Sequence, residues 1–416
     1  MKDYTGLAGP AYFILIALEV WAAKRRGVRV YRLNDAINDV STGLLMQLAV
    51  LSFGGLIVAS YIGIYQSWRI ADWSPESATT WIACFLAVDF TYYWFHRLSH
   101  EVNFLWAAHV VHHQSEDFNL AVALRQSTLQ PFFSAFFYLA LALLGFPPLV
   151  FFACSAINTI YQFWLHTQMI DRLGPLEAVF VTPSHHRVHH GRNPIYIDRN
   201  HGGTFIVWDR LFGTFQREEE TVVYGITKPL ASWNPIWANL HYWIELAESA
   251  RKARGPADKI RMFLKMPGWF PQELGGVQSA PPIEAEPGKF DRRYPREVGD
   301  YAIVQFALLT TVLVGLLFMV GSYGFAVTAA AGVAIIWGLV NLGGLFETKA
   351  WAYRSEAVRV AIVPLAPLVL LSGDAAGAWA ALLGLGFVVF LYRMPGLRSV
   401  FLDAGQASPD PEETVE

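Results

Sequence analysis

The chain has 416 residues, of which 54% are hydrophobic, 15% aromatic and only 16% charged, and its net charge is −3. Because an ordinary soluble domain carries about 25% charged residues, this composition argues against a soluble globular protein and indicates an integral membrane protein. No basic face is present, so no nucleic acid partner is expected. Cys84 and Cys154 are the two cysteines, and both lie in apolar stretches, which predicts buried thiols rather than a disulfide framework.

Apolar stretches predict an all-α, polytopic membrane protein with about nine transmembrane helices, since a spanning helix needs about 20 largely apolar residues. The first stretch is expected to be an uncleaved anchor, because basic residues follow it from Lys24 to Arg32 instead of preceding it. The predicted spans lie near residues 7–23, 44–65, 78–95, 129–145, 148–167, 301–321, 324–345, 360–372 and 376–392.

Basic loops give these spans an orientation. With the N-terminus outside, residues 96–130, residues 166 onward and the basic residues of 349–359 all fall on the cytoplasmic side, as the positive-inside rule requires. A histidine-rich helical cap is therefore predicted on that side. Aromatic and basic residues in 233–269 suit a helix in the headgroup plane, with a solvated helical cap as the alternative.

Five regions follow from this pass along the chain. They are N-terminal transmembrane helices (1–77), a catalytic domain (78–230), an interfacial segment and linker (231–300), C-terminal transmembrane helices (301–395) and a disordered tail (396–416).

The histidines carry the most specific signal. All twelve except His241 lie between His96 and His201. They include one pair spaced by four and two triplets with the spacing i, i+3, i+4, in which residues share a helix face. The clusters are His96 and His100; His109, His112 and His113; and His186, His189 and His190. A structural zinc site takes four ligands and favours thiolates, so this number of imidazoles predicts a two-metal site compatible with iron.

Two further polar positions lie within apolar spans. His166 follows Asn158 and Gln162 at intervals of eight and four residues, which makes a polar stripe that faces inward. His166 is therefore a predicted further ligand, and a hydrogen-bonded interface histidine is the alternative. Asp89 lies two turns before His96, and it is expected either to fix an imidazole or to make a helix-packing hydrogen bond. The spacing does not decide whether the remaining histidines, His185, His201 and His241, bind metal.

The strings around these histidines resemble the membrane-bound fatty acid hydroxylase and sterol desaturase superfamily, whose di-iron centres are held by one H-x(3–4)-H box and two H-x-x-H-H boxes. The resemblance covers residues 90–225 and rests on strings such as Trp106-Ala-Ala-His109, Ala123-Leu-Arg-Gln-Ser127 and Trp208-Asp-Arg-Leu-Phe-Gly-Thr-Phe215. It implies that the iron ligands are His96, His100, His109, His112, His113, His186, His189 and His190.

Within that superfamily the strings are most similar to the alkylglycerol monooxygenase family, whose members cleave ether lipids and depend on a pterin. The resemblance implies an O2-dependent monooxygenase with two iron ions and a tetrahydropterin, acting on a lipid from the bilayer. Glu101 matches a glutamate associated with the pterin requirement, which implies a catalytic and cofactor-binding role. The chain departs from the family at His201, where Asn-Tyr-Gly-Gly is usual.

Two other interpretations stay open. One is a sterol, sphingolipid or fatty-acyl hydroxylase or desaturase that has the same di-iron centre and takes electrons from a protein donor. The other is a membrane metal-binding or transport protein. Transporters place ionisable residues near the middle of the bilayer, whereas these histidines lie at and beyond the predicted helix ends, which favours an enzyme.

Overall fold

A computed structural model describes residues 9–284, 288–319, 322–371 and 374–402. The regular elements in these residues are all helical, which confirms the predicted all-α class. The chain divides into two compact units. The first comprises Met1–Leu230 with Trp237–Lys289, and the second comprises Ala231–Ile236 with Phe290–Glu416.

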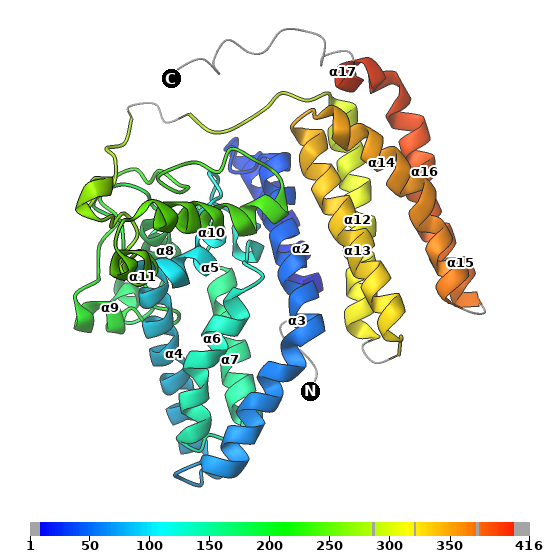
Figure 1. Ribbon diagram of the computed structural model, residues 1–416. Helices are drawn as coiled ribbons and strands as arrows, with labels where there is room; N and C mark the ends of the chain where they lie inside the picture. Colours follow the sequence, from blue (N-terminus) through cyan, green and yellow to red (C-terminus); the bar gives the residue numbers. More distant parts are fainter. Residues whose placement is uncertain (1–8, 285–287, 320–321, 372–373, 403–416) are drawn as a thin grey trace. The chain divides into compact units, whose positions relative to one another are not determined.

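The long helices of the first unit form a bundle. They are α2 (Gly9–Arg26), α3 (Leu33–Trp68), α4 (Ala78–Glu101), α6 (Gln130–Leu143) and α7 (Pro148–Phe163), of which α3, α4, α6 and α7 lie side by side (Figure 1). Their core includes Tyr61, Phe151 and both cysteines, which are buried thiols as predicted. The turn between α6 and α7 needs Gly145, which has a φ of 89° and whose Cβ would lie 1.9 Å from the Ala71 carbonyl oxygen.

The remaining helices of this unit, most of them shorter, gather at one end of the bundle (Figure 1). They are α5 (Asn103–His113), α8 (Pro183–His189), α9 (Val207–Phe212), α10 (Pro235–Lys252) and α11 (Pro256–Leu264), with 3-10 turns at Val122–Leu124, Gly174–Ala178 and Gln272–Leu274. Extended Val102 separates α4 from α5, so the chain changes direction immediately after the first histidine pair. A proline at the first turn of α8 fixes where that helix begins.

The second unit contains α12 (Arg296–Phe318), α13 (Phe325–Phe346), α14 (Ala350–Ile362), α15 (Ala366–Leu370), α16 (Asp374–Arg393) and α17 (Arg398–Leu402), with 3-10 turns at Val363–Leu365 and Pro395–Leu397. The predicted span 360–372 is not one helix. Instead α14 ends at Ile362, because Pro364 and Pro367 lack the N–H that a continuous helix needs. Helix α17 lies in the first part of the predicted disordered tail, and residues 403–416 lie outside the described residues.

Four of the described helices are long and apolar enough to cross a membrane, namely α3, α12, α13 and Ala375–Arg393 of α16. Helices α6 and α7 are apolar but have 14 and 16 residues, fewer than the approximately 20 that a perpendicular span needs. The chain is therefore a multi-pass membrane protein. The full count of nine spans stays a prediction.

Candidate metal centre

Nine buried histidines from α4, α5, α8 and the turn after α7 gather into two clusters. The five-histidine cluster consists of His96, His100, His109, His113 and His189, and the four-histidine cluster consists of His112, His166, His186 and His190. Within each cluster one nitrogen of every ring lies within 4.8 Å of the others. These nine are the residues that the sequence predicts as ligands, and their metal-binding role stays a prediction.

Each triplet contributes to both clusters. His109 and His113, one turn apart on α5, join the five-histidine cluster, whereas His112 joins the other. The other triplet, His186, His189 and His190, divides in the opposite way. His186 and His190 join the four-histidine cluster, and His189 joins the five-histidine cluster. The i, i+3, i+4 spacing makes this division possible, since the three side chains fan out from one helix face. The clusters are neighbours, with 4.4 Å between the ring centroids of His113 and His190.

The Nε2 atoms converge inside each cluster. In the five-histidine cluster, His109 Nε2 lies 3.1 Å from His96 Nε2 and 3.2 Å from His113 Nε2. The four-histidine cluster shows the same pattern, with His166 Nε2 at 2.9 Å from His186 Nε2 and 3.3 Å from His112 Nε2.

The Nδ1 atoms of several of these rings face acceptors outside the clusters. The Nδ1 of His96 lies 2.8 Å from the His201 carbonyl oxygen, and that of His112 lies 2.8 Å from the Arg125 carbonyl oxygen. The Nδ1 of His189 lies 3.0 Å from the Arg199 carbonyl oxygen. His109 Nδ1 lies 2.8 Å from Gln130 Oε1, and His166 Nδ1 lies 3.0 Å from the Gln162 carbonyl oxygen. A carbonyl oxygen can only accept, so each Nδ1 carries the proton and each Nε2 presents a lone pair to its cluster.

Other nitrogens point inward without a partner. Among the described residues, the Nε2 atoms of His100, His189 and His190 are buried and make no hydrogen bond. An unpaired buried nitrogen is rare in a folded protein and calls for a missing partner such as an ion. Two metal ions, one per cluster, would satisfy these atoms, so the residues present fit a metal pair.

Burial keeps these imidazoles neutral. Loss of solvent, followed by the neighbouring imidazoles, holds the pKa values of His186, His189 and His190 well below the usual histidine value. Burial lowers the pKa of His109 to about 4. Neutral imidazole is the form that binds a metal. A set of nitrogen donors without thiolate suits iron, copper, nickel or zinc.

Arg187 fixes the short helix α8 between its neighbours. Its Nε and Nη2 donate to the two carboxylate oxygens of Glu218 at 2.7 and 2.8 Å, and its Nη1 donates to the carbonyls of Thr167 and Ile170. A bidentate pair of this kind sets orientation as well as position. Arg187 therefore joins α8 to the segment that carries His166.

The structure decides between the two expectations for Asp89. Its carboxylate accepts hydrogen bonds from Asn158 Nδ2, the backbone N–H groups of Thr204 and Phe205, and Trp208 Nε1. No imidazole among the described residues donates to it, so the prediction that Asp89 fixes a ring directly is wrong, and the packing alternative holds. The reason is distance, since two helical turns place Asp89 about 10 Å along α4 from His96.

The three unassigned histidines lie outside both clusters. His241 is buried beside the carbonyl of Ala238, and the ring of His185 packs against Phe215. His201 is fully buried with its ring centroid 5.0 Å from that of His100, but its nitrogens do not join the convergent set.

Glu101 is the last residue of α4 and directly follows His100 of the five-histidine cluster. Its Oε1 accepts a 2.8 Å hydrogen bond from Arg97 Nε, and its side chain is 34% exposed. Asp198 lies beside the same cluster, since its Oδ1 is 3.5 Å from His100 Nδ1. Burial, and after it the charge of Glu101, raises the pKa of Asp198 to about 6. A partly open, polar edge thus adjoins one metal position.

The sequence assigned no role to Gln130, Arg125 or Asp209. Gln130 Oε1 accepts from His109, and the Arg125 carbonyl accepts from His112. Asp209 holds the backbone of His201, whose carbonyl accepts from His96. Arg125 and Asp209 occur within the strings that carry the family resemblance, which was the available signal. The contacts of Arg125 and Asp209 involve backbone groups, which a sequence does not show.

Comparisons with known proteins indicate the family to which the chain belongs. The Fatty acid hydroxylase family model matches residues 81–214, a range that contains all nine cluster histidines. The chain is 40% identical to the alkylglycerol monooxygenase of Xenopus tropicalis over 86% of this chain and 81% of that protein. It is 43% identical to the human alkylglycerol monooxygenase over 74% and 70% of the two chains. Against the ornithine lipid hydroxylase OlsE of Rhizobium tropici, identity is 29% over 47% and 63%.

No solved structure matches the chain. The histidine clusters, the membrane helices and the extent of these matches together identify the chain as a membrane-bound lipid monooxygenase that belongs to the fatty acid hydroxylase family and is related to the alkylglycerol monooxygenases.

Proposed function

We propose that this chain oxidises alkyl ether lipids with O2 at a pair of iron ions held by the nine clustered histidines. The observation that supports this most is the pair of buried nitrogen-donor sets, found in a chain 40% identical to an alkylglycerol monooxygenase. Hydroxylation of the carbon beside the ether oxygen gives a hemiacetal. The hemiacetal then breaks down to an aldehyde and a glycerol derivative.

An unactivated C–H bond needs an oxidising metal centre, because acid–base groups cannot attack it. When bound, two iron ions would supply the oxidising power by sharing the electrons that O2 cleavage requires. One oxygen atom enters the lipid and the other leaves as water, with two electrons and two protons from a reductant. The protein orients the imidazoles through their Nδ1 hydrogen bonds and excludes water, since the nine rings are 1–6% exposed.

We propose a tetrahydropterin as the reductant, bound next to Glu101. The carboxylate is partly exposed, belongs to the residue that follows His100 in the chain, and is held by Arg97 at 2.8 Å. A carboxylate in this place can accept hydrogen bonds from the amino and ring N–H groups of a pterin. Electrons would then enter on the side of the five-histidine cluster.

Glu101→Gln is expected to raise the tetrahydropterin concentration needed for half-maximal turnover by about tenfold, because an amide replaces only part of the hydrogen bonding of a carboxylate. Iron content should not change. Titrating tetrahydropterin against turnover of purified enzyme checks this, and Glu76→Gln, at an exposed loop carboxylate, serves as the matched control. An unchanged pterin dependence in Glu101→Gln would contradict the assignment.

Substrate class is tested by measuring O2 consumption and products of the purified chain in nanodiscs with an alkylglycerol, a fatty acid or a sterol, each with and without tetrahydropterin. The proposal predicts aldehyde release from the alkylglycerol only when pterin is present. The similarity to ornithine lipid hydroxylase OlsE keeps an acyl-lipid hydroxylase as the second candidate. Hydroxylation of acyl substrates at a rate that does not depend on pterin would support that second candidate.

We further propose that α10 and α11 lie along the membrane surface on the cytoplasmic side. Trp237, Leu240 and Ile244 are 39–47% exposed and follow one face of α10, and Ile260 and Leu264 on α11 are 62% and 63% exposed. Basic residues cluster at the end of α10. Exposed apolar rows beside basic residues are typical of interfacial helices.

Cysteine labelling is expected to place Lys228 on the cytoplasmic side and Gln66 on the opposite side. Both side chains are exposed, whereas Gln114, in the first histidine-rich segment, is buried and unsuitable for labelling. A membrane-impermeant maleimide applied to intact cells should label Gln66→Cys but not Lys228→Cys. Labelling of Lys228→Cys from outside would refute the cytoplasmic location of the histidine clusters.

A further inference from the structure

The two histidine clusters take their outer hydrogen bonds from different parts of the chain. In the five-histidine cluster, three of the five rings face one loop, residues 198–205. His96 Nδ1 donates to the His201 carbonyl at 2.8 Å, and His189 Nδ1 donates to the Arg199 carbonyl at 3.0 Å. His100 Nδ1 faces the Asp198 carboxylate at 3.5 Å. This loop, here called the acceptor loop, therefore fixes both the tautomer and the direction of most rings in that cluster.

Asp209 holds the acceptor loop in place. Its carboxylate is fully buried and accepts from the backbone N–H of His201 at 2.7 Å and from that of Gly202 at 2.8 Å. Thr214 Oγ1 donates to the same carboxylate at 2.7 Å. The fit is tight, because a Cβ on Gly202 would lie 2.9 Å from Asp209 Oδ2. Asp209 touches no cluster ring itself and acts on His96 through the peptide unit of His201.

The hydrogen-bond acceptors described for the rings of the four-histidine cluster lie outside the acceptor loop. His112 Nδ1 donates to the Arg125 carbonyl at 2.8 Å, and His166 Nδ1 donates to the Gln162 carbonyl at 3.0 Å. Arg125 is 1% exposed, and its guanidinium is bound on several sides. It donates to the Val111 carbonyl, Asn38 Oδ1, Asp39 Oδ1 and Gln114 Oε1 at 2.5–3.0 Å.

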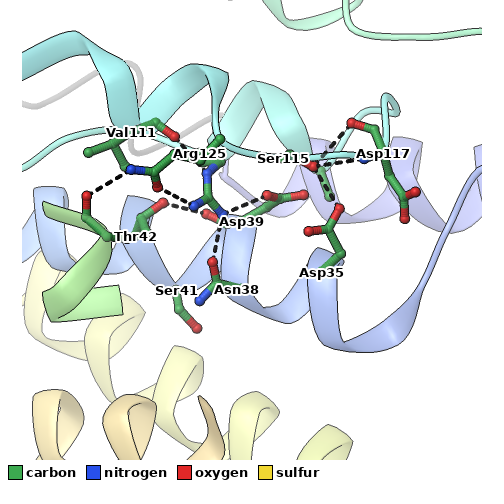
Figure 2. A network of polar contacts seen from close by, with 12 residues as sticks. Asp35, Asn38, Asp39, Ser41, Thr42, Val111, Ser115, Asp117 and Arg125 are labelled. Atoms are coloured by element: carbon green, nitrogen blue, oxygen red, sulfur yellow. Dashed lines mark hydrogen bonds and ion pairs between the residues drawn. The ribbon is translucent and has the colours of Figure 1, made fainter. Parts of the chain in front are cut away.

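Figure 2 shows this arginine between α3 and the α5 region, with Asn38 and Asp39 on one side and Val111 on the other. The guanidinium thus anchors the backbone that carries the acceptor for His112. Lysine cannot replace it, because one ammonium group cannot reach four acceptors in these directions.

We propose that the two metal positions have separate supports, with Asp209 as the positioning residue for the five-histidine cluster and Arg125 as the positioning residue for the four-histidine cluster. This inference rests on the proposed metal pair. Its consequence is that one metal can be loosened without the other. Loss of an outer hydrogen bond to a ligand histidine typically weakens metal binding about 10- to 100-fold.

The test uses the purified full-length chain loaded with ferrous iron, and it follows iron release to a ferrous chelator. Asp209→Asn and Arg125→Lys should each speed the release of one iron by about 10- to 100-fold and leave the other at the wild-type rate. Asp72→Asn and Arg261→Lys alter exposed side chains, and they are the matched controls that should release iron as the wild type does.

Two backgrounds identify which iron is loosened. In His186→Ala, which breaks the four-histidine cluster, adding Asp209→Asn should make the remaining iron labile, whereas adding Arg125→Lys should not. In the double variant His109→Ala with His113→Ala, which leaves three imidazoles in the five-histidine cluster, the two effects should be exchanged. A general loss of fold would instead make the remaining iron labile in both backgrounds, whichever of the two substitutions is added.

The proposal is overturned if either variant speeds the release of both irons equally, or if the effects do not depend on the background. Should Asp209→Asn not fold, Thr214→Val removes one hydrogen bond to the same carboxylate and should speed the release of the same iron. A wild-type chain that binds no iron would instead refute the proposed function.

Discussion

Replacing His112 or His189 by alanine is expected to abolish lipid oxidation while leaving the chain folded and inserted in the membrane. His112 belongs to the four-histidine cluster and His189 to the five-histidine cluster, so each variant damages a different metal position. Both positions are needed if two irons share the electrons for O2 cleavage. Neither residue lies in one of the four candidate membrane-spanning helices, which is why insertion should persist.

The two variants should differ in iron content. His112→Ala leaves three imidazoles in its cluster, whereas His189→Ala leaves four in its own. We therefore expect His112→Ala to fall to about one iron per chain, and His189→Ala to retain more iron while being equally inactive. Iron analysis and turnover on the purified variants check this. His241→Ala, at a buried histidine outside both clusters, should keep both properties. Turnover near the wild-type level in either cluster variant would contradict the di-iron proposal.

The sequence predicts which histidines lie close together, because their spacing along the chain matches the geometry of a helix. An i, i+3, i+4 triplet on a helix offers rings to two neighbouring points, and the structure divides His109, His112 and His113 between the two clusters in that way. The polar stripe before His166 also indicated its inward direction correctly, since Asn158 is buried and Gln162 Nε2 donates to it.

What surrounds those rings was not predictable, because most of the acceptors are backbone carbonyls. Any residue type can supply a carbonyl, so the contacts of His96 with His201 and of His112 with Arg125 leave no trace in composition or spacing. The sequence left two roles open for Asp89 for a related reason. Its partners lie in the turn at Thr204 and Phe205, more than a hundred residues away in the chain.

The second predicted span is part of a longer helix, because polar side chains ahead of the span find partners inside the fold. Hydropathy begins the second predicted span near residue 44, but α3 begins at Leu33. Its first turns carry Asn38 and Asp39, which are buried against Arg125, so the polar residues ahead of the predicted span are helical and enclosed. A hydropathy average over neighbouring residues does not include Arg125, which lies 86 residues after Asp39 in the chain.

The second unit contains a buried ion pair whose disruption should destabilise the protein strongly. Glu356 is fully buried and Arg359 is 3% exposed, and they are joined by hydrogen bonds of 2.6 and 2.8 Å. Tyr301 and Asn341 also donate to the carboxylate, and Arg359 donates to Gln305 at 2.7 Å. This network links α12, α13 and α14.

Arg359→Met is expected to lower the free energy of unfolding by about 3–5 kcal/mol, because it leaves a buried carboxylate without its counter-ion. Denaturant unfolding in mixed micelles measures this. The double variant Glu356→Gln with Arg359→Met should recover most of the loss, since the glutamine is neutral and its carbonyl oxygen can still accept from Tyr301 or Asn341.

Iron content provides the control for that experiment. All nine cluster histidines belong to the first unit, so under conditions where Arg359→Met stays folded it should bind as much iron as the wild type. A double variant less stable than Arg359→Met would show that the charges themselves, and not only their pairing, stabilise the second unit. If Arg359→Met costs less than about 1 kcal/mol, the pair behaves like a solvent-exposed salt bridge, and its burial between the helices contributes little to holding them together.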